Sequence, residues 1–313
     1  METLALGNSD LKITRIGFGA WAAGGPWQFG WGSQEDSDSI AAIHRALELG
    51  SNWIDTAAVY GLGHSEEVVG RAVAAWRGSR PYIFTKAARV WDDKGRVSTS
   101  TKAESIRHEV EASLRRLKVD VIDLYQMHWP GANLAETLDG WAEMARLKEQ
   151  GKVRWIGVSN FSVEEMRAAQ AIAPITSLQP PYSLIRRKIE AEVLPFCASN
   201  RIGTLVYSPM GSGLLTGAFT RDRVAKLPAD DWRRNNLEFQ EPKLTANLAL
   251  VDRLQKVAER HRRSPGEVAI AWTLQNPAVT AAIVGARSPK QVEGTFAAAD
   301  LRLTADDLRL LEA

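Results

Sequence analysis

The sequence predicts an α/β fold, a (β/α)8 TIM barrel with an N-terminal β-hairpin and extra C-terminal helices. Short apolar segments typical of buried strands alternate with amphipathic helical stretches along almost the whole chain. Eight such units favour closure into a barrel over an open sheet. No linker, low-complexity run or change of composition divides the 313 residues. We therefore expect a single domain over residues 1–313.

The elements follow in order. Residues 3–14 predict a hairpin, because Asn8, Ser9 and Asp10 supply turn chemistry. Eight segments then fit buried strands: 15–21, 52–57, 82–87, 121–129, 153–160, 177–183, 203–210 and 281–286. Apolar stripes at helical spacing mark helices at residues 35–50 and 65–76, along Ile106, Val110, Leu114 and Leu117, and along Leu138, Trp141 and Ala145. Helices at residues 265–275 and from residue 305 are expected to lie outside the eightfold set.

Composition excludes several classes of partner. The 39 basic and 37 acidic residues are spread along the chain, and a net charge of +2 argues against a nucleic-acid partner. No apolar run approaches the ~18 residues of a membrane span, and the N-terminus lacks a signal peptide pattern. We expect a cytoplasmic protein, monomeric by default. The single cysteine excludes an internal disulfide, and the five histidines lack ligand spacing, so no metal is expected.

Four titratable residues fall where a barrel enzyme builds its site, at the C-terminal ends of strands and in the loops that follow. Asp55, Lys86 and His128 end the second, third and fourth predicted strands. Tyr60 lies in the loop after the second strand. Singly, each has an ordinary explanation as a turn cap, a solvated strand end or a packing residue. Together, at one barrel mouth, they predict a catalytic set.

This set suits the protonation of a carbonyl oxygen. A tyrosine with a pKa of about 10 is a poor acid at neutral pH unless its phenolate is stabilised. We expect Lys86, held by Asp55, to lower the pKa of Tyr60 and make it a general acid. His128 would donate a second hydrogen bond to the same oxygen. The set contains no reductant, so a hydride must come from elsewhere.

With GVSNF at 157–161, LQPPYS at 178–183 and YSPMGSGLLTG at 207–217, the four residues resemble the aldo-keto reductase family. The segment LGNSDLKITRIGFG at 6–19 resembles its bacterial branches. The resemblance implies a small-molecule carbonyl substrate and an extended nicotinamide cofactor, usually NADPH, bound without a Rossmann domain. Implied cofactor residues are Gly19, Ala20, Trp21 and Asp55 near the nicotinamide, Ser159, Asn160 and Gln179 at its carboxamide, Tyr207 against its ring, and Ser208, Pro209, Met210, Gly211, Ser212, Gly213 and Leu214 around the pyrophosphate.

The segment GARSPKQVEGT, residues 285–295, departs from the family pattern at the adenosine end. Gly294 and Thr295 replace the usual Glu-Asn pair. Arg287 and Arg233 are candidates for a charge-assisted clamp on a 2′-phosphate, which favours NADPH. The same segment supplies two further candidate cofactor contacts, Gly285 and Gln291.

A second glycine motif and several tryptophans complete the candidates. Residues 17–22 match the G-x-G-x-x-G/A fingerprint, but the AAGGPWQFGWG run at 22–32 cannot be a regular helix, so we expect a loop over the mouth. The expected aromatic substrate walls are Trp27, Trp31, Trp91 and Trp129. Two alternatives stay open: an NAD(P)+-dependent sugar or polyol dehydrogenase, and a regulatory module resembling potassium-channel β-subunits. The intact set of four favours an enzyme.

Overall fold

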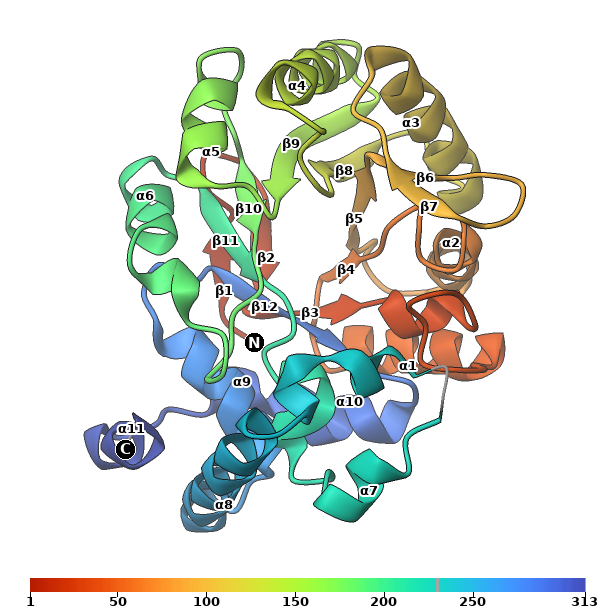
Figure 1. The fold of residues 1–313 in the computed structure, drawn as a ribbon. Helices are drawn as coiled ribbons and strands as arrows, with labels where there is room; N and C mark the ends of the chain where they lie inside the picture. Colours follow the sequence, from red (N-terminus) through yellow and green to blue (C-terminus); the bar gives the residue numbers. More distant parts are fainter. Residues whose placement is uncertain (229–230, 313) are drawn as a thin grey trace.

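The eight predicted strands close into a parallel barrel in a computed structural model that describes residues 1–228 and 231–312 (Figure 1). The strands, in barrel order, are β10 (Ser177–Gln179), β11 (Gly203–Val206), β12 (Ala281–Gly285), β3 (Ile16–Gly19), β4 (Trp53–Asp55), β5 (Tyr82–Ala87), β8 (Ile122–Met127) and β9 (Val153–Ser159). Pairing of β12 with β3, from Ala282 with Ile16 to Gly285 with Gly19, completes the ring. The predicted barrel is confirmed. Residues 229, 230 and 313, which the predicted domain includes, lie outside the described residues.

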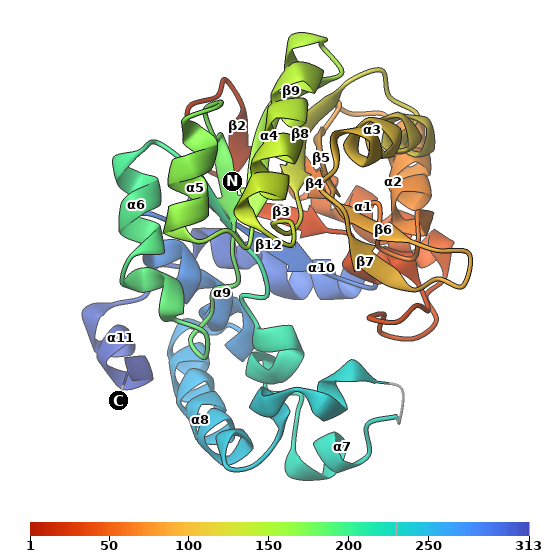
Figure 2. The ribbon, with the colours of Figure 1, turned by 45° about the horizontal axis from the view of Figure 1, so that its top comes forward.

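Helices surround the barrel (Figures 1 and 2). They are α1 (Asp36–Glu48), α2 (His64–Ala75), α3 (Ala103–Leu117), α4 (Leu134–Glu149), α5 (Val163–Gln170), α6 (Val193–Ser199), α7 (Arg221–Ala225), α8 (Lys243–His261), α9 (Pro265–Gln275), α10 (Pro289–Phe296) and α11 (Ala305–Glu312). The predicted stripe of α1 faces inward, with Ile43 fully buried and Leu47 nearly so. Among the described residues, no helix combines the length and the apolar character needed to cross a bilayer.

The prediction that residues 265–275 lie outside the eightfold set was wrong. Helix α9 is buried along its whole length from Pro265 to Leu274, and it packs on β12 and α10. A helix that is apolar on all sides is stable only between other layers, which is why α9 lies inside the helical ring. Its start is fixed by a capping box between Ser264 and Glu267. The longer α8 packs on α9 and α11 and extends away from the barrel in Figure 2.

Two antiparallel hairpins flank the barrel at opposite ends. The predicted one, β1 (Thr3–Ala5) with β2 (Lys12–Thr14), is confirmed. Its buried Leu6 and Leu11 share an apolar cluster with Trp53, at the N-terminal end of β4. This hairpin therefore covers the end of the barrel opposite the predicted site.

The second hairpin, β6 (Arg89–Trp91) with β7 (Val97–Thr99), was not predicted from the sequence. It begins directly after β5, where Ala88 has a positive φ of 72° and turns the chain back over the C-terminal end of the barrel. Strands of three residues are too short to show a periodicity. The hairpin places Arg89 and Val97 in the lining of the central pocket.

Candidate active site

The structure brings the four predicted residues together at the C-terminal end of the barrel. Lys86, from β5, donates a hydrogen bond from Nζ to Asp55 Oδ1 at 2.5 Å. The same ammonium group donates to Tyr60 Oη at 3.2 Å and to the carbonyl oxygen of Thr56 at 2.8 Å. All three donors of Lys86 therefore have partners, and the phenol is held against the lysine.

The Asp55 carboxylate is fixed from its other side by two amides. Its Oδ2 accepts hydrogen bonds from Gln179 Nε2 at 2.8 Å and from Gln126 Nε2 at 3.3 Å. Asp55 and Lys86 are 2% and 1% exposed, so this ion pair is almost completely shielded from water. A buried pair with every acceptor satisfied holds one geometry, and that geometry sets the position of Tyr60 Oη.

Electrostatics at Tyr60 differ from the expectation. Burial, reinforced by the Asp55 charge, raises the pKa of Tyr60 well above the ordinary value of 10.0. The lowering that we expected from Lys86 does not prevail, because removing the phenol from water disfavours the phenolate more strongly. Burial also lowers the pKa of Lys86, against the opposing effect of Asp55. Tyr60 is thus a neutral phenol at pH 7, and because Lys86 donates to its oxygen, its own proton is available to a ligand in the pocket.

His128, which follows β8, meets the ring of Tyr60 edge-on at a centroid distance of 5.7 Å. Burial lowers the pKa of His128 well below its ordinary value, and the charges of Lys86 and Arg89 add to this effect. The imidazole is therefore neutral at pH 7 and carries one N–H donor. Its backbone is held by two bonds, from His128 N to the Ala87 carbonyl at 3.0 Å and from Asn160 Nδ2 to the His128 carbonyl at 3.0 Å.

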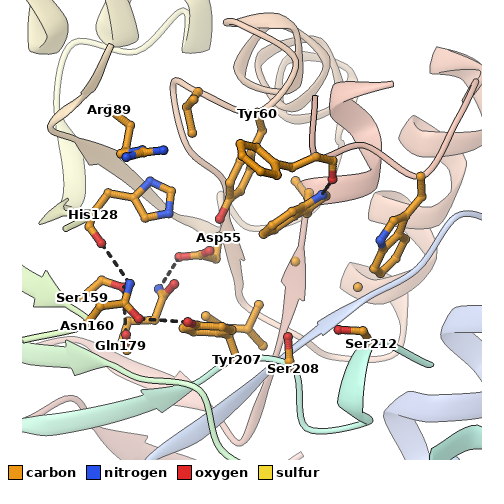
Figure 3. Close-up of a pocket in the computed structure, with 18 of the residues that line it drawn as sticks. Asp55, Tyr60, Arg89, His128, Ser159, Asn160, Gln179, Tyr207, Ser208 and Ser212 are labelled. Atoms are coloured by element: carbon orange, nitrogen blue, oxygen red, sulfur yellow. Dashed lines mark hydrogen bonds between the residues drawn. The ribbon is translucent and has the colours of Figure 1, made fainter. Parts of the chain in front are cut away.

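These groups face a cavity of about 550 Å³ (Figure 3). The predicted residues in its lining are Gly19, Ala20, Trp21, Trp27, Trp31, Asp55, Tyr60, His128, Trp129, Ser159, Asn160, Gln179, Tyr207, Ser208, Pro209, Met210, Ser212, Gly213 and Gly285. The predicted residues outside the lining are Lys86, Trp91, Gly211, Leu214, Arg233, Arg287 and Gln291. Lys86 lies behind Asp55 and Tyr60, Leu214 is buried in a separate apolar cluster, and Trp91 packs beside the pocket.

One wall of the pocket fits a flat ring that carries an amide. Tyr207 Oη donates to Asn160 Oδ1 at 2.9 Å, and Asn160 Nδ2 donates to Ser159 Oγ at 3.0 Å. Gln179 continues this polar row, and Figure 3 shows the ring of Tyr207 across the space from Asp55 and Tyr60. Amide and hydroxyl groups beside an exposed aromatic face match the hydrogen bonding and stacking that a nicotinamide needs.

The loop after β11 fits the next part of such a cofactor. Ser208, Gly211, Ser212 and Gly213 have positive φ values of 55°, 58°, 59° and 93°. Ser208, Ser212 and Gly213 line the pocket, whereas the N–H groups of Gly211 and Gly213 already donate to the carbonyl oxygens of Ser208 and Met210. The hydroxyl groups of Ser208 and Ser212 are therefore the groups of this loop that could hold a pyrophosphate beside the wall that fits a nicotinamide.

The predicted clamp for a 2′-phosphate is not preformed. Arg287 donates to Gln34 Oε1 at 2.7 Å and to the carbonyl oxygens of Trp31 and Ser33. Arg233 is paired with Asp231 at 2.6 Å and lies over the ring of Trp31. Both guanidinium groups are therefore engaged within the protein, Arg287 by a loop distant in sequence and Arg233 mainly by the carboxylate two residues before it.

Seven residues of the lining were not predicted from the sequence: Phe29, Val59, Arg89, Val97, Arg186, Trp232 and Ile283. Arg89 follows Lys86 by three residues, so applying the strand-end rule to the whole β5 loop would have found it. Phe29 lies between two predicted wall tryptophans, and Trp232 adjoins Arg233. Arg186 had no signal, because its approach to the pocket depends on the turn that Ser183 and Arg186 form.

Comparisons with known proteins identify relatives of the whole chain. The sequence model of the Aldo/keto reductase family matches residues 15–313. Aldo-keto reductase YhdN of Bacillus subtilis is 38% identical, over 98% of this chain and 91% of its own. An NADH-specific methylglyoxal reductase of Escherichia coli is 34% identical, over 99% and 97%. The structure of a glycerol dehydrogenase from Gluconobacter oxydans superposes with a TM-score of 0.90 at 38% identity, over 99% of this chain and 94% of that chain.

Proposed function

The chain belongs to the aldo/keto reductase family of oxidoreductases, and from that premise we propose that it reduces aldehyde or ketone carbonyls to alcohols with NADPH, Tyr60 acting as the general acid. The observation that carries the proposal is the position of Lys86 Nζ, which is hydrogen-bonded both to Asp55 Oδ1 and to Tyr60 Oη at the wall of the pocket. A neutral phenol held in this way can donate its proton to a ligand bound in the pocket.

Each residue then has a defined task. A bound reduced nicotinamide supplies a hydride to the carbonyl carbon. As that C–H bond forms, the electron pair of the C=O π bond moves to oxygen, and Tyr60 Oη gives its proton to that oxygen. Lys86 stabilises the phenolate that remains, through the hydrogen bond it already donates. His128 donates a hydrogen bond to the same carbonyl oxygen and polarises it.

Substitution of Tyr60 by Phe tests the proposal, because it removes only the phenolic oxygen. We expect kcat/KM for aldehyde reduction to fall by a factor of about 10² to 10⁴, the range for loss of a general acid. NADPH binding, followed by quenching of tryptophan fluorescence, should be retained. Tyr82→Phe, which removes a phenol from the start of β5 at the other end of the barrel, is the matched control and should keep full activity. Turnover of the Tyr60→Phe enzyme near the wild-type rate would refute the assignment.

The preference for NADPH depends on Arg287 exchanging its contacts with the 31–34 loop for a 2′-phosphate. A guanidinium group pairs more strongly with a phosphate than with backbone carbonyls, which favours that exchange. A relative described as NADH-specific makes NADH the competing cofactor. The test is the KM for NADPH and for NADH in the wild type and in Arg287→Ala. Equal use of both cofactors, unchanged by the substitution, would contradict the preference.

A second candidate is the reverse reaction, oxidation of a polyol with NADP+ or NAD+. The structural similarity to a glycerol dehydrogenase favours it. The same site would serve in molecules whose Tyr60 is the phenolate that Lys86 stabilises, because that form accepts the hydroxyl proton, so the oxidation rate should rise with pH. Assays of aldehydes, ketones, sugars and polyols at one pH distinguish the two by which redox pair has the highest kcat/KM, because the ratio of the two directions within one pair is fixed by its equilibrium constant.

A further inference from the structure

The lining of the pocket carries an unbalanced positive charge. Its charged side chains are Asp55, Arg89 and Arg186, because His128 is neutral. Asp55 is already balanced by Lys86 behind it. Among the described residues, neither arginine has a carboxylate within ion-pair distance, and the side-chain bond of Arg89 runs from Nη1 to Thr99 Oγ1 at 2.8 Å. A guanidinium has five N–H donors, so most of those on Arg89 remain for a ligand.

Arg89 lies at the reacting end of the pocket. Figure 3 shows its guanidinium beside the ring of His128, on the side away from Asn160 and directed toward the open space. Burial and the charge of Lys86 lower the pKa of His128, and the charge of Arg89 adds to that effect. A group bound to Arg89 would therefore belong to the same molecule as the carbonyl that His128 and Tyr60 hold.

The hairpin holds Arg89 in this position before any ligand arrives. Ala88 N donates to Glu109 Oε2 at 3.0 Å, and Ser100 N donates to the Ala88 carbonyl at 3.2 Å. Arg89 itself is in register with Thr99 across the β6–β7 pair. The side chain is half-buried, and burial lowers the pKa of its guanidinium. A preorganised and partly desolvated cation binds an anion more strongly than a solvated surface arginine does.

We propose that Arg89 binds a carboxylate of the substrate, so that the enzyme prefers carbonyl compounds that carry an acidic group. This inference rests on the proposed function, since it places a carbonyl compound in the pocket.

One guanidinium balances one carboxylate in a bidentate pair. A phosphate carries a charge of about −1.5 to −2 and calls for a second cation beside it. The only other arginine in the described lining is Arg186; burial raises the pKa of Tyr207 to about 12 against the opposing charge of Arg186, and the same charge helps to lower the pKa of Glu238. Trp27, Phe29 and Trp129 give the rest of the pocket an apolar, aromatic character that suits the body of such a substrate.

The kinetic test compares 4-carboxybenzaldehyde with its neutral methyl ester, methyl 4-formylbenzoate, at saturating cofactor. We expect the wild type to favour the acid in kcat/KM, and Arg89→Gln to reduce the acid-to-ester ratio by about 10- to 100-fold, the value of a hydrogen bond to a charged group. Arg96→Gln is the matched control: it removes an exposed arginine from the same hairpin, one paired with Asp92, and should leave the ratio unchanged. Arg89→Lys should keep part of the preference for the acid, because lysine keeps the positive charge but lacks the planar guanidinium that binds a carboxylate through two hydrogen bonds.

A binding measurement separates this inference from the proposed function. Benzoate and benzamide are titrated against tryptophan fluorescence with NADP+ present, which requires no turnover. Tighter binding of benzoate in the wild type, lost in Arg89→Gln but not in Arg96→Gln, supports the inference even if neither aldehyde is reduced. Equal binding of benzoate and benzamide, or a benzoate preference that survives in a folded Arg89→Gln protein with an unchanged melting temperature, overturns it.

Discussion

Replacing Lys86 with Met would leave the Asp55 carboxylate buried without its cation. The carboxylate is 2% exposed and keeps only the amide bonds from Gln179 and Gln126. Removal of one partner from a buried ion pair costs about 3–5 kcal/mol, because the other charge stays desolvated. Domains have a total free energy of unfolding of about 5–15 kcal/mol, so Lys86→Met should lose a large part of it and still fold at 25 °C.

A double variant shows whether the unpaired charge is the cause. Lys86→Met combined with Asp55→Asn removes both charges and should lie within about 2 kcal/mol of the wild type, because neutral replacement of a buried pair is often tolerated. The assay is urea unfolding at pH 7, followed by tryptophan fluorescence and circular dichroism. The reasoning fails if the single variant loses less than about 1 kcal/mol, or if the double variant is as unstable as the single one. Both variants should be inactive, so stability alone carries this test.

Three further predictions follow from the same structure. Because His128 is neutral, kcat for reduction should show no half-maximal rate near the ordinary histidine value of 6.5, and its loss should come at higher pH, as Lys86, whose pKa burial lowers from 10.5, gives up its charge; a half-maximal rate near 6.5 would contradict it. Burial raises the pKa of Glu109 from 4.5 to about 7, so its contribution to stability is present below pH 4.5 and is lost as pH rises through about 7. That difference corresponds to about 3 kcal/mol, and Glu109→Gln should flatten the fall in urea midpoint that the wild type shows between pH 5 and 8. Gly61→Ala should destabilise by at least about 2 kcal/mol, since Gly61 has a φ of 62° and a Cβ there would lie 2.1 Å from the Gly24 carbonyl oxygen. Gly294→Ala, in a helix with open space around it, should instead stabilise by about 0.5–1 kcal/mol, and thermal melting that showed equal effects of the two substitutions would contradict the comparison.

The barrel and its central residues were predictable because both follow from local rules. Strands buried on both faces read as apolar runs, and the strand-end rule selects Asp55, Lys86 and His128 without knowledge of any contact. The rule predicts where these residues lie but not the direction of their pKa shifts. Burial of Tyr60 depends on Trp21 and Trp27, which pack around it from another loop, so the direction of its pKa shift needs the folded chain.

Long-range partners account for most of what the sequence did not reveal. Arg287 binds a loop about 250 residues earlier in the chain, and nothing in the local sequence predicts that contact. The apolar character of α9 on all sides predicts that it is buried, but its packing against β12 and α10 depends on the tertiary structure. The β6–β7 hairpin was missed for a different reason. Its strands have three residues each, too few to show an alternating pattern on either side of the polar turn that begins at Asp92.

Closure of the barrel between β12 and β3 has a consequence for synthesis of the protein. The first barrel strand ends at Gly19, but its partner on one side, Ala281–Gly285, is synthesised only after residue 280. Until then the nascent sheet has two unpaired edges, and exposed edges recruit other strands. Ribosome-bound chains that end before residue 281 should therefore bind holding chaperones, and the released chain that contains β12 should not.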